Sequence, residues 1–172
     1  MKKIHVISKK QLVVSNIAGN LKFRCAIGRS GMIDAAKKRE GDGASPIGIW
    51  PMKRVFYRSD RLRAPETRLP LTTLEANMGW CDAPDDPHYN QLVQRPYPAS
   101  HEALWREDHV YDIIVELAHN DNPPLPHLGS AIFMHVAKPD YSPTQGCAAL
   151  ALEDLLQVLA TSDADTSLEF RD

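Results

Sequence analysis

Residues 21–27 alternate between apolar and polar side chains, and this alternation decides the fold class more strongly than any other part of the sequence. The run reads Leu-Lys-Phe-Arg-Cys-Ala-Ile. Side chains on a β-strand point to alternate faces, so a period of two predicts a strand with one face in a core and one in solvent. A helix would instead repeat its apolar residues every three or four positions.

Other short runs also favour strands, and helices are few. Further strands are predicted at Ile4–Ile7, Gln11–Val14, Ile47–Arg58, Tyr111–Leu117 and Ser130–His135. Ser8–Lys10 would form a turn between the first two, and Pro51 requires the third to lie at a sheet edge or to contain a bulge. Only Leu152–Ala160, with acidic residues in its first turn, and the short His101–Arg106 favour helix.

Length and composition fit one domain over residues 1–172. The chain is 43% hydrophobic and 24% charged, as in ordinary globular proteins, and is long enough to bury a core. Its 20 basic and 22 acidic residues give a net charge of −2, which argues against a nucleic-acid-binding protein. No uncharged apolar run approaches the ~20 residues of a membrane span, and three cysteines are too few for a disulfide framework.

The amino terminus starts like a basic leader but does not continue as one. Lys9 and Lys10 interrupt the segment that would have to be apolar, and no small-residue cleavage site follows. The sequence therefore predicts a cytoplasmic protein. A periplasmic location would need an unrecognised export route or a leader that has been removed.

Prolines mark the irregular parts of the chain. Four of the thirteen fall within Trp80–Ser100, and three more lie at positions 123, 124 and 126. Irregular segments of this length are commonly functional in compact domains. We therefore expect residues 80–100 to form a lid or capping loop over a cleft.

The chemistry is concentrated near the carboxyl-terminal third of the chain. A predicted strand ends at His135, and the pair Gly146-Cys147 follows a proline-bearing loop. A thiol acts as a nucleophile when it is a thiolate, and we expect the imidazolium of His135 to stabilise the thiolate of Cys147. Gly146 would allow close backbone approach beside N–H groups suited to an oxyanion hole. The spacing alone also fits a buried structural thiol, because cysteine is among the most buried residue types.

Three ordered motifs resemble those of the L,D-transpeptidase catalytic domain of bacterial peptidoglycan enzymes. They are Gly28-Arg29-Ser30-Gly31, Asp42-Gly43-Ala44-Ser45-Pro46-Ile47-Gly48, and His135 with Thr144-Gln145-Gly146-Cys147. The resemblance implies a single mainly β domain, a curved sheet or sandwich with one or two short helices. Two positions depart from the family pattern, because Gln145 replaces a common histidine and Ala149 a common arginine. These departures predict a branch with its own substrate recognition.

The resemblance also implies a two-step acyl transfer without a cofactor. Cys147 would attack the L-centre carbonyl of a diamino acid in a peptidoglycan stem peptide or muropeptide and form a thioester. His135 would act as base and then as acid. The backbone carbonyl of Val136 would hold the tautomer of His135. Carbapenems would acylate the same thiol.

Three functions remain open at this stage. A transpeptidase would pass the acyl group to an amine, an L,D-carboxypeptidase would pass it to water, and an idle domain would only bind stem peptides. Family precedent favours the first, and the lack of a recognisable leader favours the second. The third would need a broken pair, whereas Cys147 and His135 are both present.

Further residues are candidates for substrate binding. Arg39 and Arg54 flank the second motif and could pair with a substrate carboxylate, although solvated surface charge is the simpler interpretation. Tyr111 could line the cleft or pack in the core. Asn120 could lie near the cleft or only build a turn. Thr144 belongs to the nucleophile motif.

A zinc site is the remaining alternative. The residue types that bind zinc are present at His88, His101, His109 and Cys81. Their spacings are not those of known zinc sites. We therefore expect no metal and no cofactor.

Overall fold

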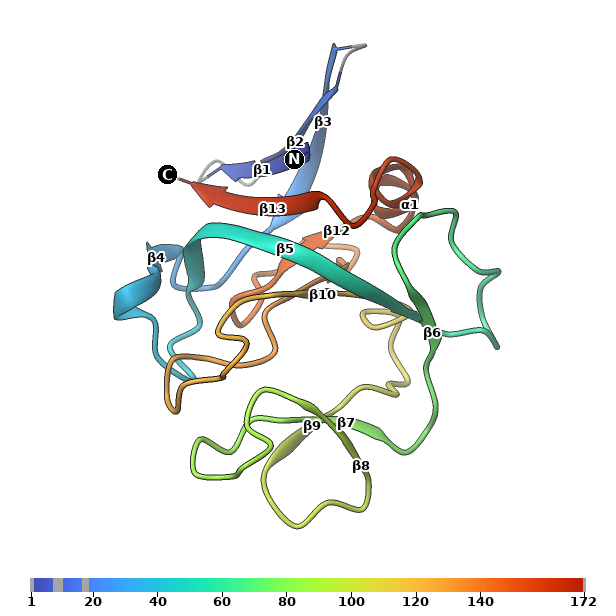
Figure 1. The fold of residues 1–172 in the computed structure, drawn as a ribbon. Helices are drawn as coiled ribbons and strands as arrows, with labels where there is room; N and C mark the ends of the chain where they lie inside the picture. The colour runs from blue at the N-terminus through green and yellow to red at the C-terminus, as the bar shows by residue number, and fades with distance from the viewer. Residues whose placement is uncertain (1, 8–10, 17–18, 172) are drawn as a thin grey trace.

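The computed structural model describes residues 2–7, 11–16 and 19–171, and this part of the chain is mainly β (Figure 1). The amino-terminal strands are β1 (Lys2–Ile7), β2 (Gln11–Asn16), β3 (Gly19–Ala26), β4 (Met32–Asp34), β5 (Ser45–Tyr57) and β6 (Leu71–Thr73). They are followed by β7 (Met78–Cys81), β8 (Leu92–Gln94), β9 (His101–Ala103), β10 (Ile113–Leu117), β11 (Phe133–Val136), β12 (Ala148–Leu150) and β13 (Thr166–Arg171). The α-helix α1 (Leu152–Ala160) lies between the last two strands, and a short 3-10 helix covers Ala35–Lys37.

The strands form a large main sheet and a small one. The main sheet has ten strands in the order β10-β11-β12-β3-β2-β1-β13-β5-β4, with β6 beside β5. β10 pairs with β5 as well as with β11, so the series of paired strands returns on itself. The small sheet, β8-β7-β9, lies below the main sheet in Figure 1, and we call it the cap sheet. The predicted fold class is confirmed.

The sequence patterns located most elements correctly. The strand predictions correspond to β1, β2, β3, β5, β10 and β11. The predicted helix at Leu152–Ala160 has the bounds of α1, with Glu153 and Asp154 in its first turn. The turn predicted at residues 8–10 lies outside the described residues.

One prediction around the cap sheet was wrong. His101–Arg106 was expected to be helical, but its first half is β9, which pairs with β7 from Gly79↔Ala103 to Cys81↔His101. A six-residue helix is marginal in water, and sheet pairing is the more stable choice. Trp80–Ser100, expected to be an irregular segment, is irregular over most of its length, although it begins in β7 and contains β8. Its prolines lie in the turns that connect these short strands.

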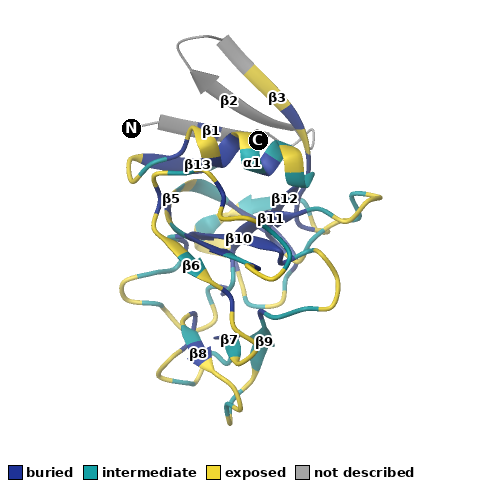
Figure 2. Ribbon diagram, turned by 90° about the vertical axis from the view of Figure 1, so that its right-hand side faces the viewer, coloured by how far each residue is buried: buried dark blue, intermediate teal, exposed yellow. Residues whose placement is uncertain are grey.

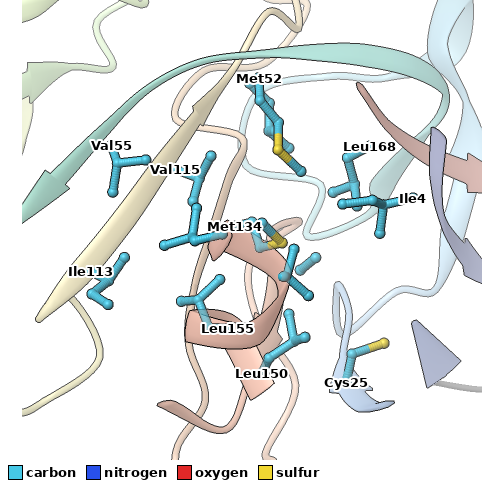
Figure 3. Close-up of a cluster of buried hydrophobic side chains, with 14 of the residues drawn as sticks. Ile4, Cys25, Met52, Val55, Ile113, Val115, Met134, Leu150, Leu155 and Leu168 are labelled. Carbon is cyan, nitrogen blue, oxygen red and sulfur yellow. The ribbon is translucent and has the colours of Figure 1, made fainter. Parts of the chain in front are cut away.

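The two faces of the main sheet bury two separate cores. On β11, Met134 packs in the larger core with Val115 and with Leu155 of α1 (Figure 3). Phe133, its neighbour, packs in the smaller core with Trp80 of the cap sheet. Successive side chains on a strand point to opposite faces, so β11 serves both cores. Figure 2 shows β10 and β11 as largely buried between the helix and the cap sheet.

The alternation predicted over residues 21–27 is confirmed only from Phe23 to Cys25, since Ala26 and Ile27 are buried as well. Phe23 and Cys25 are buried in the larger core, and Arg24 is exposed with its guanidinium 4.1 Å from the ring centroid of Tyr141. Leu21 is 45% exposed, because the outer part of β3 projects away from the domain (Figure 1). Burial also raises the pKa of the Cys25 thiol to about 12, so this cysteine is structural.

The irregularity predicted at Pro51 is present in β5. This strand pairs with β13 up to Pro51 and with β10 from Met52 onward. The register with β10 shifts between Glu116 and Leu117, which marks a β-bulge next to the proline. Proline lacks the N–H of a ladder hydrogen bond, so it fits the point where β5 changes partner.

The three sequence motifs meet at the start of β5, around its first residue, Ser45. Ser45 Oγ accepts a hydrogen bond from Gly28 N at 3.0 Å and donates one to the carbonyl of Gly146 at 2.7 Å. Arg29 N donates to the carbonyl of Thr144 at 2.9 Å, which joins the first motif to the third. A Cβ atom on Gly28 would lie 2.4 Å from a backbone oxygen of the second motif, so only glycine fits there.

In the described part of the chain, no helix has the length and apolar character needed to cross a membrane.

Replacing Ser45 tests whether this junction holds the domain together. Ser45→Ala would leave a buried N–H and a buried carbonyl without partners, so we expect the free energy of unfolding to fall by about 2–4 kcal/mol. Ser30→Ala is the matched control, because Ser30 Oγ makes one exposed hydrogen bond, to the carbonyl of Asp42 at 2.8 Å. It should cost about 1 kcal/mol or less. Equal losses in urea denaturation would contradict a special role for Ser45.

Candidate active site

A cavity of about 520 Å³ lies between the main sheet and the cap sheet, and Cys147 and His135 both line it. Each of these residues is only about 6% exposed. His135 comes from β11, Ala149 from the adjacent strand β12, and Glu102 from β9 of the cap sheet. The cavity therefore has walls from both sheets, with the predicted nucleophile and base on the wall that the main sheet supplies.

Cys147 is held from several sides just before β12 begins. Its Sγ donates to the carbonyl of Ala131 at 3.2 Å and accepts from Phe133 N at 3.4 Å. Thr144 Oγ1 donates to the Cys147 carbonyl at 2.8 Å and accepts from Gly146 N at 3.1 Å. These bonds give the thiol one defined position in the cavity wall.

Gly146 allows its backbone to pass close to neighbouring residues, but its N–H is not free to donate to a substrate. Its φ is +140°, and a Cβ atom there would lie 2.9 Å from the carbonyl oxygen of Ala44 and 3.0 Å from the side chain of Ile132. Its N–H is already donated to Thr144. The oxyanion hole expected around Cys147 therefore does not include the Gly146 N–H in this arrangement.

His135 is oriented by the backbone carbonyl that the resemblance implies. Its Nδ1 lies 2.9 Å from the carbonyl of Val136. A carbonyl can only accept, so the proton is on Nδ1 and Nε2 remains as the basic nitrogen. The Tyr111 ring packs edge-on against the imidazole with the ring centroids 5.3 Å apart. In the strand register His135 lies opposite Ala149, two residues after Cys147.

Burial keeps both members of the pair neutral. It raises the pKa of the Cys147 thiol to about 12 and lowers that of His135 to about 4. The sequence led us to expect a thiolate stabilised by an imidazolium. The structure instead favours a neutral thiol and a neutral imidazole on the wall of one cavity. A neutral imidazole can serve as a general base.

Two of the predicted substrate-binding residues line the cavity. Tyr111 is buried there, and its hydroxyl donates to Glu102 at 2.7 Å. Burial raises the pKa of Tyr111 well above its usual value, so it stays protonated. Thr144 also lines the cavity, but its hydroxyl is occupied by the backbone around Cys147.

The other three predicted residues have structural partners elsewhere and are not among the described residues that line the cavity. The guanidinium of Arg39 donates to two backbone carbonyls of its own turn. Arg54 pairs with Glu116 at 2.5 Å on the main sheet. Asn120 donates to the carbonyl of Leu125 at 2.9 Å and builds the turn before the second proline loop. The pattern of charge and turn residues around the motifs did not distinguish these positions from true cavity residues.

The residues considered for zinc have other contacts. His109 lies 2.7 Å from Asp112, and the rings of His88 and His101 both pack edge-on against Tyr97. Cys81, expected in a loop, is buried in β7. The residues with described positions include no group of three or more His, Cys, Asp or Glu side chains placed to hold a metal ion.

Asn90 supports the predicted nucleophile Cys147 through Ala131, and the sequence analysis did not identify it. Its Oδ1 accepts from Trp80 Nε1 at 2.9 Å and from Ala131 N at 3.0 Å. Its Nδ2 donates to the carbonyls of His119 and Asn120. The carbonyl of Ala131 in turn accepts the Cys147 thiol. No local pattern marks Asn90, because all partners of its side chain but Trp80 are about 30 or more residues away in the chain.

Comparison with known proteins agrees with the motifs. The chain matches the family model of the L,D-transpeptidase catalytic domain (YkuD) over residues 2–169. No curated protein matches it. Similar solved structures are L,D-transpeptidase 1 from Mycobacterium tuberculosis (11% identity, TM-score 0.44), L,D-transpeptidase from Mycobacterium smegmatis (10%, 0.48) and the helical cell shape determining protein Pgp2 from Campylobacter jejuni (17%, 0.44). Each match covers 99% of this chain, which spans 61%, 58% and 47% of those chains, respectively.

The buried imidazole should make the protein sensitive to acid. The pKa of His135 is lowered from 6.5 to about 4 on folding. Between these values the unfolded chain binds more protons than the folded chain, so the free energy of unfolding decreases as the pH is lowered. Urea denaturation at about pH 7 and pH 4.5 measures how much free energy of unfolding each protein loses on acidification. We expect this loss to be about 2 kcal/mol smaller for His135→Gln than for the parent. His127→Gln, whose side chain is 63% exposed, should follow the parent. Parallel pH curves for the parent and the His135 variant would contradict the burial argument.

Proposed function

Because the chain belongs to the L,D-transpeptidase catalytic domain family, we propose that it is a cysteine acyltransferase acting on the L-centre diamino acid of peptidoglycan stem peptides. The observation that carries the proposal is the placement of Cys147 and His135 on the wall of one cavity, with His135 Nδ1 tied to Val136. An idle peptide-binding domain would not need an oriented imidazole and a thiol on the wall of the same cavity.

The first step follows from the protonation states of the pair. The Cys147 sulfur attacks the peptide carbonyl while Nε2 of His135 takes the thiol proton, so no separate thiolate has to persist in the buried site. The tetrahedral intermediate then collapses. The C–N bond breaks, the departing amine takes the proton from His135, and a thioester remains on Cys147.

The second step decides which enzyme this is. Attack by an amine of another stem peptide gives a cross-link, which is the transpeptidase reaction we propose. Attack by water gives a trimmed peptide, which is the carboxypeptidase reaction. His135, neutral again after the first step, would take the proton of either acceptor and return it to the Cys147 sulfur as the C–S bond breaks.

Acylation should depend on one thiol alone. We expect a carbapenem to leave a single covalent adduct on the peptide that contains Cys147, and Cys147→Ala to abolish both the adduct and turnover. Cys25→Ala and Cys81→Ala are the controls, since both thiols are buried and line no part of the cavity. Intact-mass and peptide mass spectrometry make the measurement. Turnover by the Cys147 variant, or an adduct on either control thiol, would overturn the assignment.

The contribution of His135 to acylation can be measured while Cys147 is kept. Replacing His135 by Gln should lower the acylation rate by about 10²–10⁴-fold, the usual contribution of general acid–base catalysis. Stopped-flow acylation by a chromogenic carbapenem measures this rate directly. A variant that is folded, by circular dichroism, yet acylates at the parent rate would show that His135 only packs.

The acceptor can be identified from the products. Purified protein incubated with disaccharide tetrapeptides should give cross-linked dimers, detected by mass. Release of the terminal residue without dimers would favour the carboxypeptidase alternative instead. If the tetrapeptides stay unchanged while Cys147 is intact, both the transpeptidase and the carboxypeptidase proposals are contradicted.

A further inference from the structure

Every hydrogen-bonding group of the Asn90 side chain has a partner, and the partners fix the orientation of its amide. Oδ1 accepts from the indole N–H of Trp80 at 2.9 Å and from the N–H of Ala131 at 3.0 Å. Nδ2 donates to two loop carbonyls at 3.0 and 2.8 Å. An amide side chain has two acceptor sites and two N–H donors, so all four are used. Reversing the amide would set N–H groups against N–H groups, so the network allows one orientation only.

Ala131, the partner nearest the nucleophile, has a strained backbone. Its φ is +53°, in the left-handed region that residues with a side chain seldom adopt. Its N–H is tied to Asn90, and its carbonyl accepts the Cys147 thiol at 3.2 Å. A residue keeps such a conformation only where its surroundings hold it, and such residues gather at functional sites. The strained residue here lies directly between Asn90 and the sulfur.

The other hydrogen bond of the sulfur leads to the same side of the molecule. Phe133 N donates to Cys147 Sγ at 3.4 Å. The ring of Phe133 packs edge-on against the indole of Trp80 in the smaller core, with the ring centroids 5.0 Å apart. Trp80 is the residue of β7 that donates to Asn90. Both hydrogen bonds of the sulfur therefore depend on backbone that the Trp80–Asn90 pair supports.

The position of the sulfur matters for the proposed acylation. A nucleophile reacts fast when it already lies close to the attacked carbonyl and points toward it, and a displacement of about 1 Å can cost about 10²-fold in rate. The thiol of Cys147 is held by one acceptor and one donor, both of them backbone groups. A loss of either hydrogen bond would let the side chain rotate away from its defined direction.

We infer that Asn90 is a positioning residue for the acylation of Cys147, and that it acts by holding the Ala131 carbonyl on the thiol. The inference rests on the function proposed above. Asn90 is not among the described residues that line the cavity, so it acts on the sulfur through Ala131 and not on the substrate. The cap sheet is then part of the apparatus that orients the nucleophile.

Asn90→Gly tests the role, because it removes the side chain and keeps a backbone at φ +56° that glycine adopts freely. We expect the maximal rate of acylation by a chromogenic carbapenem to fall by about 10–100-fold. The carbapenem concentration that gives half of this rate should not change, since no contact with the ligand is lost. Stopped-flow measurements over a range of concentrations separate the two quantities.

Ser162→Ala is the matched control for a lost buried hydrogen bond. Ser162 is 1% exposed, and its hydroxyl donates to the carbonyl of Val158 at 2.8 Å. It is not among the described residues that line the cavity. The variant should be less stable than the parent and acylate at the parent rate.

Infrared spectroscopy reports on the thiol without any reaction. The S–H stretching band moves to lower frequency when the thiol donates a hydrogen bond, as Cys147 does to Ala131. Subtracting the spectrum of the matching Cys147→Ala protein isolates this band. We expect it at higher frequency in Asn90→Gly than in the parent.

Asn90→Asp separates the two halves of the amide and decides the matter if the glycine variant does not fold. Aspartate keeps an oxygen that accepts from Ala131 and Trp80, but when ionised it cannot donate to the loop carbonyls. We expect the parent S–H band and an acylation rate close to that of the parent. A folded aspartate variant with a shifted band and slow acylation would show that the loop contacts matter instead, and would overturn the inference.

The outcomes also separate this inference from the proposed function. If the parent acylates Cys147 and a folded Asn90→Gly protein does so at the same maximal rate with the same S–H band, the acyltransferase stands and the positioning role falls. A change confined to the half-saturating concentration would assign Asn90 to binding and would overturn the role as well. If the parent forms no adduct on Cys147 with carbapenem or stem peptide, the proposed function falls and the positioning role falls with it.

Discussion

The hydroxyl of Ser45 is the single group on which the geometry of the site most depends. It joins Gly28 and Gly146, which lie 17 and 101 residues away in the sequence, through their backbone N–H and carbonyl. These backbone groups are buried where no regular strand pairing reaches both of them, so a side chain must satisfy them. The same contact sets the loop that carries Cys147 against the first residue of β5. Local order at the nucleophile is therefore a consequence of how the main sheet closes around its core.

The alternation of one strand links stability to chemistry. β11 directs Met134 into the larger core and His135 into the cavity, one residue apart. Burial of His135 is thus a by-product of the packing that holds β11 between α1 and the cap sheet. It also removes the stable ion pair that an exposed cysteine and histidine could form. In the proposed reaction, His135 therefore removes the thiol proton of Cys147 during the attack, and no thiolate has to form beforehand.

Sequence reasoning succeeded where chemistry or periodicity is local and failed where long-range pairing decides. Phe23 and Cys25 are both buried in the core, as their spacing predicts. The motif residues Ser45 and Gly146, which the sequence singled out, are joined by a hydrogen bond. His101 gave no local sign of a strand, since β9 exists only through its pairing with β7. Asn90 likewise acts through partners that are distant in the chain. Charged residues were the hardest to place, because sequence does not show which already have a partner.

In the proposed function, the nucleophile and the charged groups of the cavity come from different parts of the molecule. β11 and the loop before β12 supply the thiol and imidazole, and Ala149 leaves this wall without the arginine common in the family. Charged groups in the cavity come instead from the segments around residues 38–40, 82 and 102–106. Asn90 connects the two parts through Ala131. If the proposed function holds, substitutions of cap-sheet residues outside this connection should therefore alter peptide binding without moving Cys147 or His135.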